Sequence, residues 1–141
     1  MKKVLSILVL AIVAVQFAFA GDVITKDVKE LPLTARNFIN QYFSKPQISY
    51  IKIDSEFLSK KYEVTLTDRT EIDFDKKGNW MEVDCKKNAV PAALIPDYVK
   101  ANFPNEIITK IERKSTGIEV ELANDFSLKF NKKGQFVSLD D

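Results

Sequence analysis

Hydrophobic and polar residues alternate over many short stretches of the chain, a pattern typical of strands buried on one face. Two series of four such stretches occur, at 48–54, 62–67, 71–75 and 81–85, then at 107–112, 118–122, 126–130 and 137–139. An apolar stripe at helical spacing precedes each series, within 31–43 and within 90–103. The pattern predicts an α+β protein in which a helix and four antiparallel strands occur twice.

A repeated hairpin turn supports this duplication. Residues 75–80 read DKKGNW, and residues 131–136 read NKKGQF at the same place in the second series. We therefore expect a tandem repeat, with a first unit at 31–89 and a second at 90–141. A unit of about 60 residues buries only about 60% of its unfolded surface. Joining the units into one continuous eight-stranded sheet, with both helices on one face, is the simplest way to bury more apolar surface.

Proline residues delimit the two predicted helices. Pro46 and Pro104 end them, since proline cannot continue a helix. Pro96 lies inside the second helical pattern, so it should kink that helix or split it into a short turn and a main segment.

The N-terminus resembles an export signal. Two lysines precede an apolar run from Val4 to Val15, and small residues follow at Ala18 and Ala20. The run is short for a membrane span, which needs about 20 residues. We expect residues 1–20 to be a signal peptide cleaved near Ala20, and residues 21–30 to be a loosely docked lead. The mature protein is then periplasmic or secreted, with no membrane span.

The register of the repeated hairpin decides which side of the sheet its aromatic residue faces. A three-residue loop pairs Phe74 with Trp80 but also Ile72 with Glu82. A four-residue loop pairs apolar residues throughout: Ile72 with Met81, Leu128 with Val137, and Phe126 with Leu139. Directly opposed residues share a face, so the four-residue loop is preferred because it keeps apolar partners on the core side.

With that register, Trp80 and Phe136 point away from the helices. The same outer face carries further polar and aromatic side chains: Tyr50, Glu63, Glu71, Asp73 and Glu82. Exposed aromatic residues among polar groups often anchor a protein-binding surface. These seven residues are the candidate binding site for a protein or peptide. Two alternatives stay open: the aromatics pack over neighbouring loops, or the carboxylates bind a cation or small molecule.

Composition excludes several classes of function. Without Lys2 and Lys3 the 21 basic residues become 19, against 20 acidic ones, so the chain lacks the basic character of a nucleic-acid-binding protein. There is no histidine, which removes His-dependent nucleophiles and His-ligated metal sites. Cys85, the single cysteine, continues an inward-facing series and is expected to be a buried thiol, with intermolecular pairing as the alternative. No catalytic residues, metal site or cofactor is predicted.

Several segments resemble those of the PepSY-like periplasmic proteins. The resemblance lies in Val90-Pro91-Ala92-Ala93, Asn102-Phe103-Pro104, the strand at 117–122 and the turn segment 128–134. It implies a tandem helix-plus-four-strand fold similar to the β-lactamase inhibitor protein, whose concave sheet face grips its target enzyme. PepSY domains are also proposed to restrain proteases, so the resemblance implies a peptidase as one kind of partner. The leading expectation is a non-enzymatic, exported binding module. The cysteines that brace that inhibitor are not present in this chain.

Overall fold

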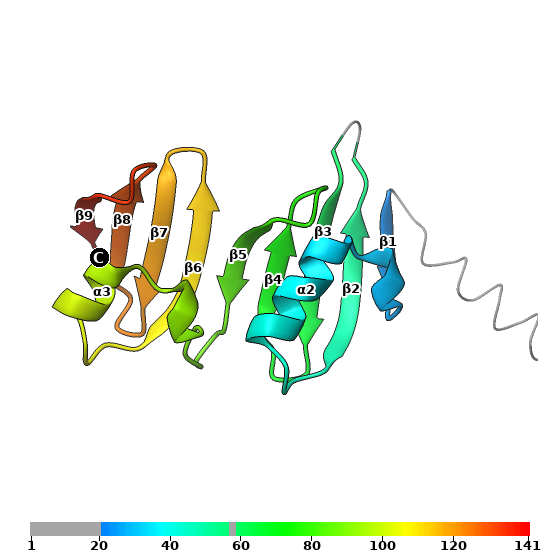
Figure 1. The fold of residues 1–141 in the computed structure, drawn as a ribbon, viewed down its shortest axis with the longest axis horizontal. Helices are drawn as coiled ribbons and strands as arrows, with labels where there is room; N and C mark the ends of the chain where they lie inside the picture. Colours follow the sequence, from blue (N-terminus) through cyan, green and yellow to red (C-terminus); the bar gives the residue numbers. More distant parts are fainter. Residues whose placement is uncertain (1–20, 57–58) are drawn as a thin grey trace, which may run out of the picture.

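The computed structural model describes residues 21–56 and 59–141, so the expected signal peptide and its cleavage point lie outside the described residues. One antiparallel sheet dominates these residues (Figure 1). Its strands are β1 (Asp22–Thr25), β2 (Ile48–Asp54), β3 (Lys61–Leu66), β4 (Glu71–Phe74), β5 (Trp80–Asp84), β6 (Ile108–Lys114), β7 (Gly117–Leu122), β8 (Ser127–Asn131) and β9 (Phe136–Asp140). The helical elements are η1 (Val28–Glu30), α2 (Leu33–Tyr42), η2 (Ala92–Leu94) and α3 (Asp97–Asn102).

The sheet is a meander in which every strand pairs with the next one along the chain. It has nine strands in the described residues, so the predicted count of eight is wrong. The additional strand is β1, which pairs Asp22 with Asp54 and Thr25 with Ile51, so this part of the expected loosely docked lead is instead a strand of the sheet. An unpaired β2 would expose its backbone N–H and C=O groups, and β1 covers that edge. The strand is only four residues long, too short for its alternation to be visible in the sequence.

Proline starts both main helices. Pro32 immediately precedes α2, and Pro96 immediately precedes α3. Pro96 thus separates η2 from α3, so the predicted helical stretch is split rather than kinked. Figure 1 shows α2 in front of the first strands and α3 in front of the last ones.

The core lies between the sheet and these helices. One row of aligned residues crosses seven strands on the helix side, and all its members have 0% exposed surface: Ile51, Val64, Ile72, Val83, Ile111, Val120 and Leu128. Burying a side chain of this size is worth about 1.5–3 kcal/mol. Phe38 of α2 and Tyr98 of α3 complete the core by packing edge-on against Phe74 and Phe130, at 5.7 Å between ring centroids in each case.

The hairpin register differs from the four-residue loop that the sequence favoured. Phe74 pairs with Trp80, as in a three-residue loop, but Ile72 then pairs with Val83. A β-bulge makes both pairings possible, because Met81 is an extra residue on β5 and is 38% exposed. The second hairpin repeats this arrangement, pairing Phe130 with Phe136 and Leu128 with Leu139 around an extra Val137. The prediction did not include this bulge. The extra residue moves the residue at the turn to the other face of the sheet, and the apolar pairs beyond the bulge remain in register.

Side-chain hydrogen bonds hold the first turn in this shape. The backbone N–H groups of Lys77 and Asn79 both donate to Asp75 Oδ1, at 2.9 Å each. Gly78 completes the turn with a φ of +86°, a conformation that glycine adopts without steric cost. The turn also lies against the start of α2, as its close approach to Pro32 shows. The hairpin tip is therefore part of the tertiary packing.

Candidate functional site

The outer face of the sheet, opposite the helices, is strongly acidic. Strand alternation and the pairing register place eleven carboxylates there: Asp22, Asp54, Glu63, Glu71, Asp73, Glu82, Asp84, Glu112, Glu119, Glu121 and Asp140. Six lysines accompany them through ion pairs: Lys52, Lys61, Lys86, Lys110, Lys114 and Lys129. Because the whole chain is close to neutral, its acidic charge is concentrated on this face.

Five of these carboxylates form one row across strands β3 to β7, each directly opposite the next: Glu63, Asp73, Glu82, Glu112 and Glu119. Like charges in directly opposed positions destabilise a sheet. Lysines offset this repulsion, for example Lys52 at 3.3 Å from Glu63 and Lys61 at 3.0 Å from Asp73. Burial raises the pKa of Asp73 and of Glu82, which shows that the centre of the row is partly shielded from water.

A shallow hollow of about 210 Å³ lies on this face over strands β2 to β4. Its lining is Tyr50, Lys52, Glu63, Thr65, Glu71 and Asp73. Four of the seven predicted site residues therefore come together here, and a fifth, Glu82, is the cross-strand neighbour of Asp73. Carboxylates beside an exposed tyrosine ring can bind a cationic group through charge and through the ring face.

Trp80 and Phe136 do not belong to this face, so their predicted outward orientation is wrong. Trp80 stacks on Phe38 of α2 at 5.9 Å between ring centroids. Phe136 stacks on Tyr98 of α3 at 4.8 Å, with an interplanar angle of 9°. The hairpin bulge is the physical reason, because an extra residue, Met81 or Val137, lets both aromatics face the helices while the pairs Ile72–Val83 and Leu128–Leu139 stay in register.

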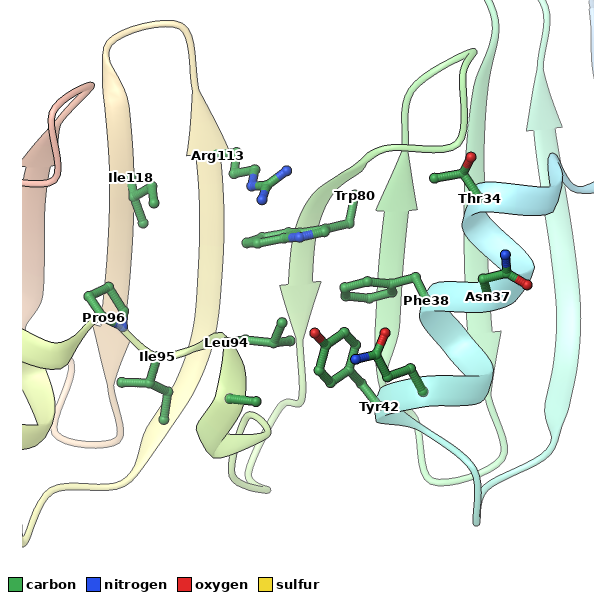
Figure 2. A pocket seen from close by; sticks show the side chains of 12 residues that line it. Thr34, Asn37, Phe38, Tyr42, Trp80, Leu94, Ile95, Pro96, Arg113 and Ile118 are labelled. Carbon is green, nitrogen blue, oxygen red and sulfur yellow. The ribbon is translucent and has the colours of Figure 1, made fainter.

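A second concave region lies on the helix side, between α2 and the segment around η2 (Figure 2). Its volume is about 600 Å³. One wall carries Phe38 and Tyr42 of α2, and the opposite wall carries Leu94, Ile95 and Pro96. Trp80 of β5 and Arg113 of β6 lie between these walls, so the region spans the junction of the two halves of the sheet. We call it the interhelix cleft.

Among the described residues that line the interhelix cleft, Arg113 is the one with a charged side chain. Its guanidinium lies over the Trp80 ring, 4.0 Å from the ring centroid. No carboxylate in the described part of the chain forms a salt bridge with it, and burial lowers the pKa of Arg113. Sequence reasoning missed this residue. The sequence pattern that could have identified it is the two-residue alternation of β6. Ile111 is buried, so Arg113, two residues later, lies on the same inward side of the strand.

Within 21–56 and 59–141, no group of three or more His, Cys, Asp or Glu residues is placed to hold a metal ion. Cys85 is a free, buried thiol, as predicted, and burial raises its pKa. A thiol in that state is a poor nucleophile. None of the helices that the structure describes is long and apolar enough to cross a membrane.

The comparisons with known proteins agree with this architecture. Residues 60–138 match the family described as "Putative beta-lactamase-inhibitor-like, PepSY-like". A search of curated proteins found no match. Among solved structures, a "putative periplasmic protein of unknown function" from Bacteroides vulgatus is 40% identical, with a TM-score of 0.80 over 86% of this chain and 100% of that one.

Two further solved structures are similar to the chain. A "putative calcium-regulated periplasmic protein" from Bacteroides thetaiotaomicron is 42% identical, with a TM-score of 0.79 over 85% of this chain and 97% of that one. A second "putative periplasmic protein" from Bacteroides vulgatus is 35% identical, with a TM-score of 0.80 over 87% of this chain and 99% of that one. The chain therefore belongs to the PepSY-like family and is a periplasmic protein.

Proposed function

We propose that this protein is a non-enzymatic binding module that holds a lysine- or arginine-rich segment of another exported protein or peptide. The binding surface is the outer face of strands β2 to β5. The observation that carries this proposal is the hollow in which Glu63, Glu71 and Asp73 surround the exposed ring of Tyr50. The family description makes an exported enzyme, held in an inhibited state, one partner of this kind.

The charge distribution favours a cationic partner. Eleven carboxylates face six lysines on the outer face, whereas the remainder of the chain carries the compensating positive charge. Such an acidic surface attracts a basic segment before contact and raises its association rate. The attraction extends over roughly one Debye length, about 8 Å at physiological salt. Binding should therefore weaken as the salt concentration rises.

The hollow has the size and groups to hold one long basic side chain. Its three carboxylates are now paired with lysines, for example Lys86 at 2.8 Å from Glu71. An arriving arginine would replace the lysines in these surface ion pairs, each of which is worth only about 0–1 kcal/mol. It would also gain a cation–π contact with Tyr50, worth about 0.5–1 kcal/mol at an exposed site.

We also infer that the chain is a tandem repeat, with units at 31–89 and 90–141 and residues 21–30 as a lead. The bulge between Ile48 and Tyr50 in β2 recurs between Ile108 and Lys110 in β6, which supports this division. The two halves differ at the positions that line the hollow when their registers are aligned. Lys110 occupies the place of Tyr50, and Lys129 occupies the place of Asp73.

A titration of the mature protein with an arginine–serine repeat peptide of nine residues tests this proposal. Isothermal calorimetry at low salt should show binding that weakens at least tenfold in the triple variant Glu63→Gln, Glu71→Gln, Asp73→Asn. The matched control neutralises three acidic residues outside the outer face: Asp97→Asn, Glu106→Gln and Asp125→Asn. Equal binding by the two triple variants, or no heat from the folded wild-type protein, would refute the proposal.

Calcium binding by the same hollow is the second candidate function, within the broader alternative of a cation or small molecule. Calcium prefers carboxylate oxygens, and one relative is described as calcium-regulated. It ranks second because the described residues contain no ready-made group of metal ligands. The same calorimetric titration, with calcium chloride in place of the peptide, tests this candidate. Heat that disappears in the site triple variant, together with no peptide binding, would favour calcium.

A further inference from the structure

We propose that the interhelix cleft is a second binding site, independent of the outer face, for the free C-terminal end of a peptide with apolar side chains. The cleft lies on the helix side of the sheet, whereas the acidic hollow lies on the opposite side. Ligands of the two sites would have opposite charge, so neither would compete directly for the other site.

The charge of the cleft selects an anion. Every lysine of the outer face pairs with at least one carboxylate, but Arg113 has no salt-bridge partner in the described part of the chain. Among the residues that the structure describes, none that lines the cleft is acidic, so none of them would repel a negative group. The contact with the Trp80 ring holds the guanidinium at the cleft, where its N–H groups can donate hydrogen bonds to a ligand. A carboxylate accepts two such bonds in parallel.

The walls of the cleft select an apolar body next to that carboxylate. Phe38 and Tyr42 face Leu94 and Ile95 across the cleft, as Figure 2 shows. Phe38 and Tyr42 are in ring contact at 4.9 Å between centroids, so they form a continuous aromatic wall. The volume of about 600 Å³ is in the range of about 300–1,000 Å³ that is common for small-ligand sites.

Two primary amides favour a peptide over a fatty acid. Asn37 and Gln41 line the cleft from the same face of α2, four residues and about one helical turn apart. A primary amide both donates and accepts hydrogen bonds, which matches the N–H and C=O groups of a peptide backbone. A fatty acid chain would leave both amides without a partner of this kind. A peptide therefore uses the polar, charged and apolar parts of the lining together.

Trp80 provides a direct readout, because it is the only tryptophan in the chain and lies in the cleft. The probes are N-acetyl-Gly-Leu-Phe with a free C-terminal carboxylate and the same peptide as its C-terminal amide. We expect a saturable change in tryptophan fluorescence with the free acid and at least tenfold weaker binding of the amide. Arg113→Gln should remove this preference, whereas Arg69→Gln, on an exposed turn outside the cleft, should keep it.

Three results would overturn the inference. Equal binding of acid and amide by the wild-type protein would show that Arg113 does not read a carboxylate. Retention of the preference in a folded Arg113→Gln variant would place the carboxylate elsewhere. Decanoate binding as tightly as the peptide acid would show that the cleft takes any amphipathic carboxylate, and that Asn37 and Gln41 do not read a peptide backbone. Circular dichroism of each variant checks that it is folded.

Discussion

The two hairpin glycines offer a matched pair of substitutions in which only the surroundings differ. Gly78 has a φ of +86° and Gly134 a φ of +79°, so alanine is strained at both positions. Placing an L-residue in the left-handed region costs about 1–2 kcal/mol. Gly134→Ala should lose this amount and no more, because no described residue apart from its chain neighbours has a heavy atom within 4 Å of the added Cβ.

Gly78→Ala should cost more because its turn lies against α2. The added Cβ would be 2.8 Å from Pro32 Cβ and 2.9 Å from the backbone nitrogen of Ala35. A backbone atom cannot move aside as a flexible side chain can, so the turn or the helix must shift. Overpacking of this kind typically costs about 1–3 kcal/mol. We therefore expect a total loss of about 2–5 kcal/mol for Gly78→Ala, adding both effects.

Urea denaturation of the mature protein measures both losses. Tryptophan fluorescence and far-ultraviolet circular dichroism should give coincident transitions, which is the condition for comparing free energies of unfolding. In thermal unfolding, each kcal/mol should lower Tm by about 4 °C for a domain of this size. Equal losses for the two variants would refute the close packing of the first hairpin tip against α2. A larger loss for Gly134→Ala would contradict the asymmetry between the two halves.

Two further predictions concern the same hairpins. Burial acts to raise the pKa of Asp75, but hydrogen bonds from Asn79 and Lys77 outweigh it, so the pKa is lowered overall. The ionised carboxylate therefore stabilises the fold at pH values above its unfolded pKa of about 3.8. This contribution to stability is lost as the pH falls below that value. Asp75→Asn keeps an acceptor for the turn and should flatten the loss of stability between about pH 4 and pH 2 in urea titrations; an unchanged acid profile would contradict this. Trp80→Ala should lower the free energy of unfolding by about 2 kcal/mol, roughly half the usual loss for a fully buried aromatic, because Trp80 is only partly buried. Denaturant titration would contradict the helix-side placement of Trp80 if this variant were as stable as the wild-type protein.

Much of the fold was visible in the sequence because strand alternation and helical spacing are local. The positions of β2 to β9 follow the alternating segments, and Pro96 marked the division between η2 and α3. The edge strand β1 was not visible, since four residues carry too little alternation. Its formation depends on the free edge of β2, which is a tertiary property.

The orientation of Trp80 could not be settled by alternation because a bulge breaks the two-residue period. Met81 is hydrophobic, so nothing in the alternation pattern marks it as the extra, exposed residue of β5. The preference for apolar pairing was sound beyond the bulge, where Ile72 meets Val83. The outer-face prediction was correct for the placement of Tyr50, Glu63 and neighbouring carboxylates, because the side of the sheet on which each of them lies does not depend on the hairpin turn.

The two halves of the sheet meet at a short joint. Strands β5 and β6 share three registered residue pairs, the fewest of the strand pairs in the described chain, whereas β2 and β3 share six. Trp80 precedes this joint on β5 and Arg113 follows it on β6, so the walls of the interhelix cleft belong to different halves of the sheet. A small change of twist at these three residue pairs would therefore change the separation of α2 from the segment around η2, and with it the width of the interhelix cleft.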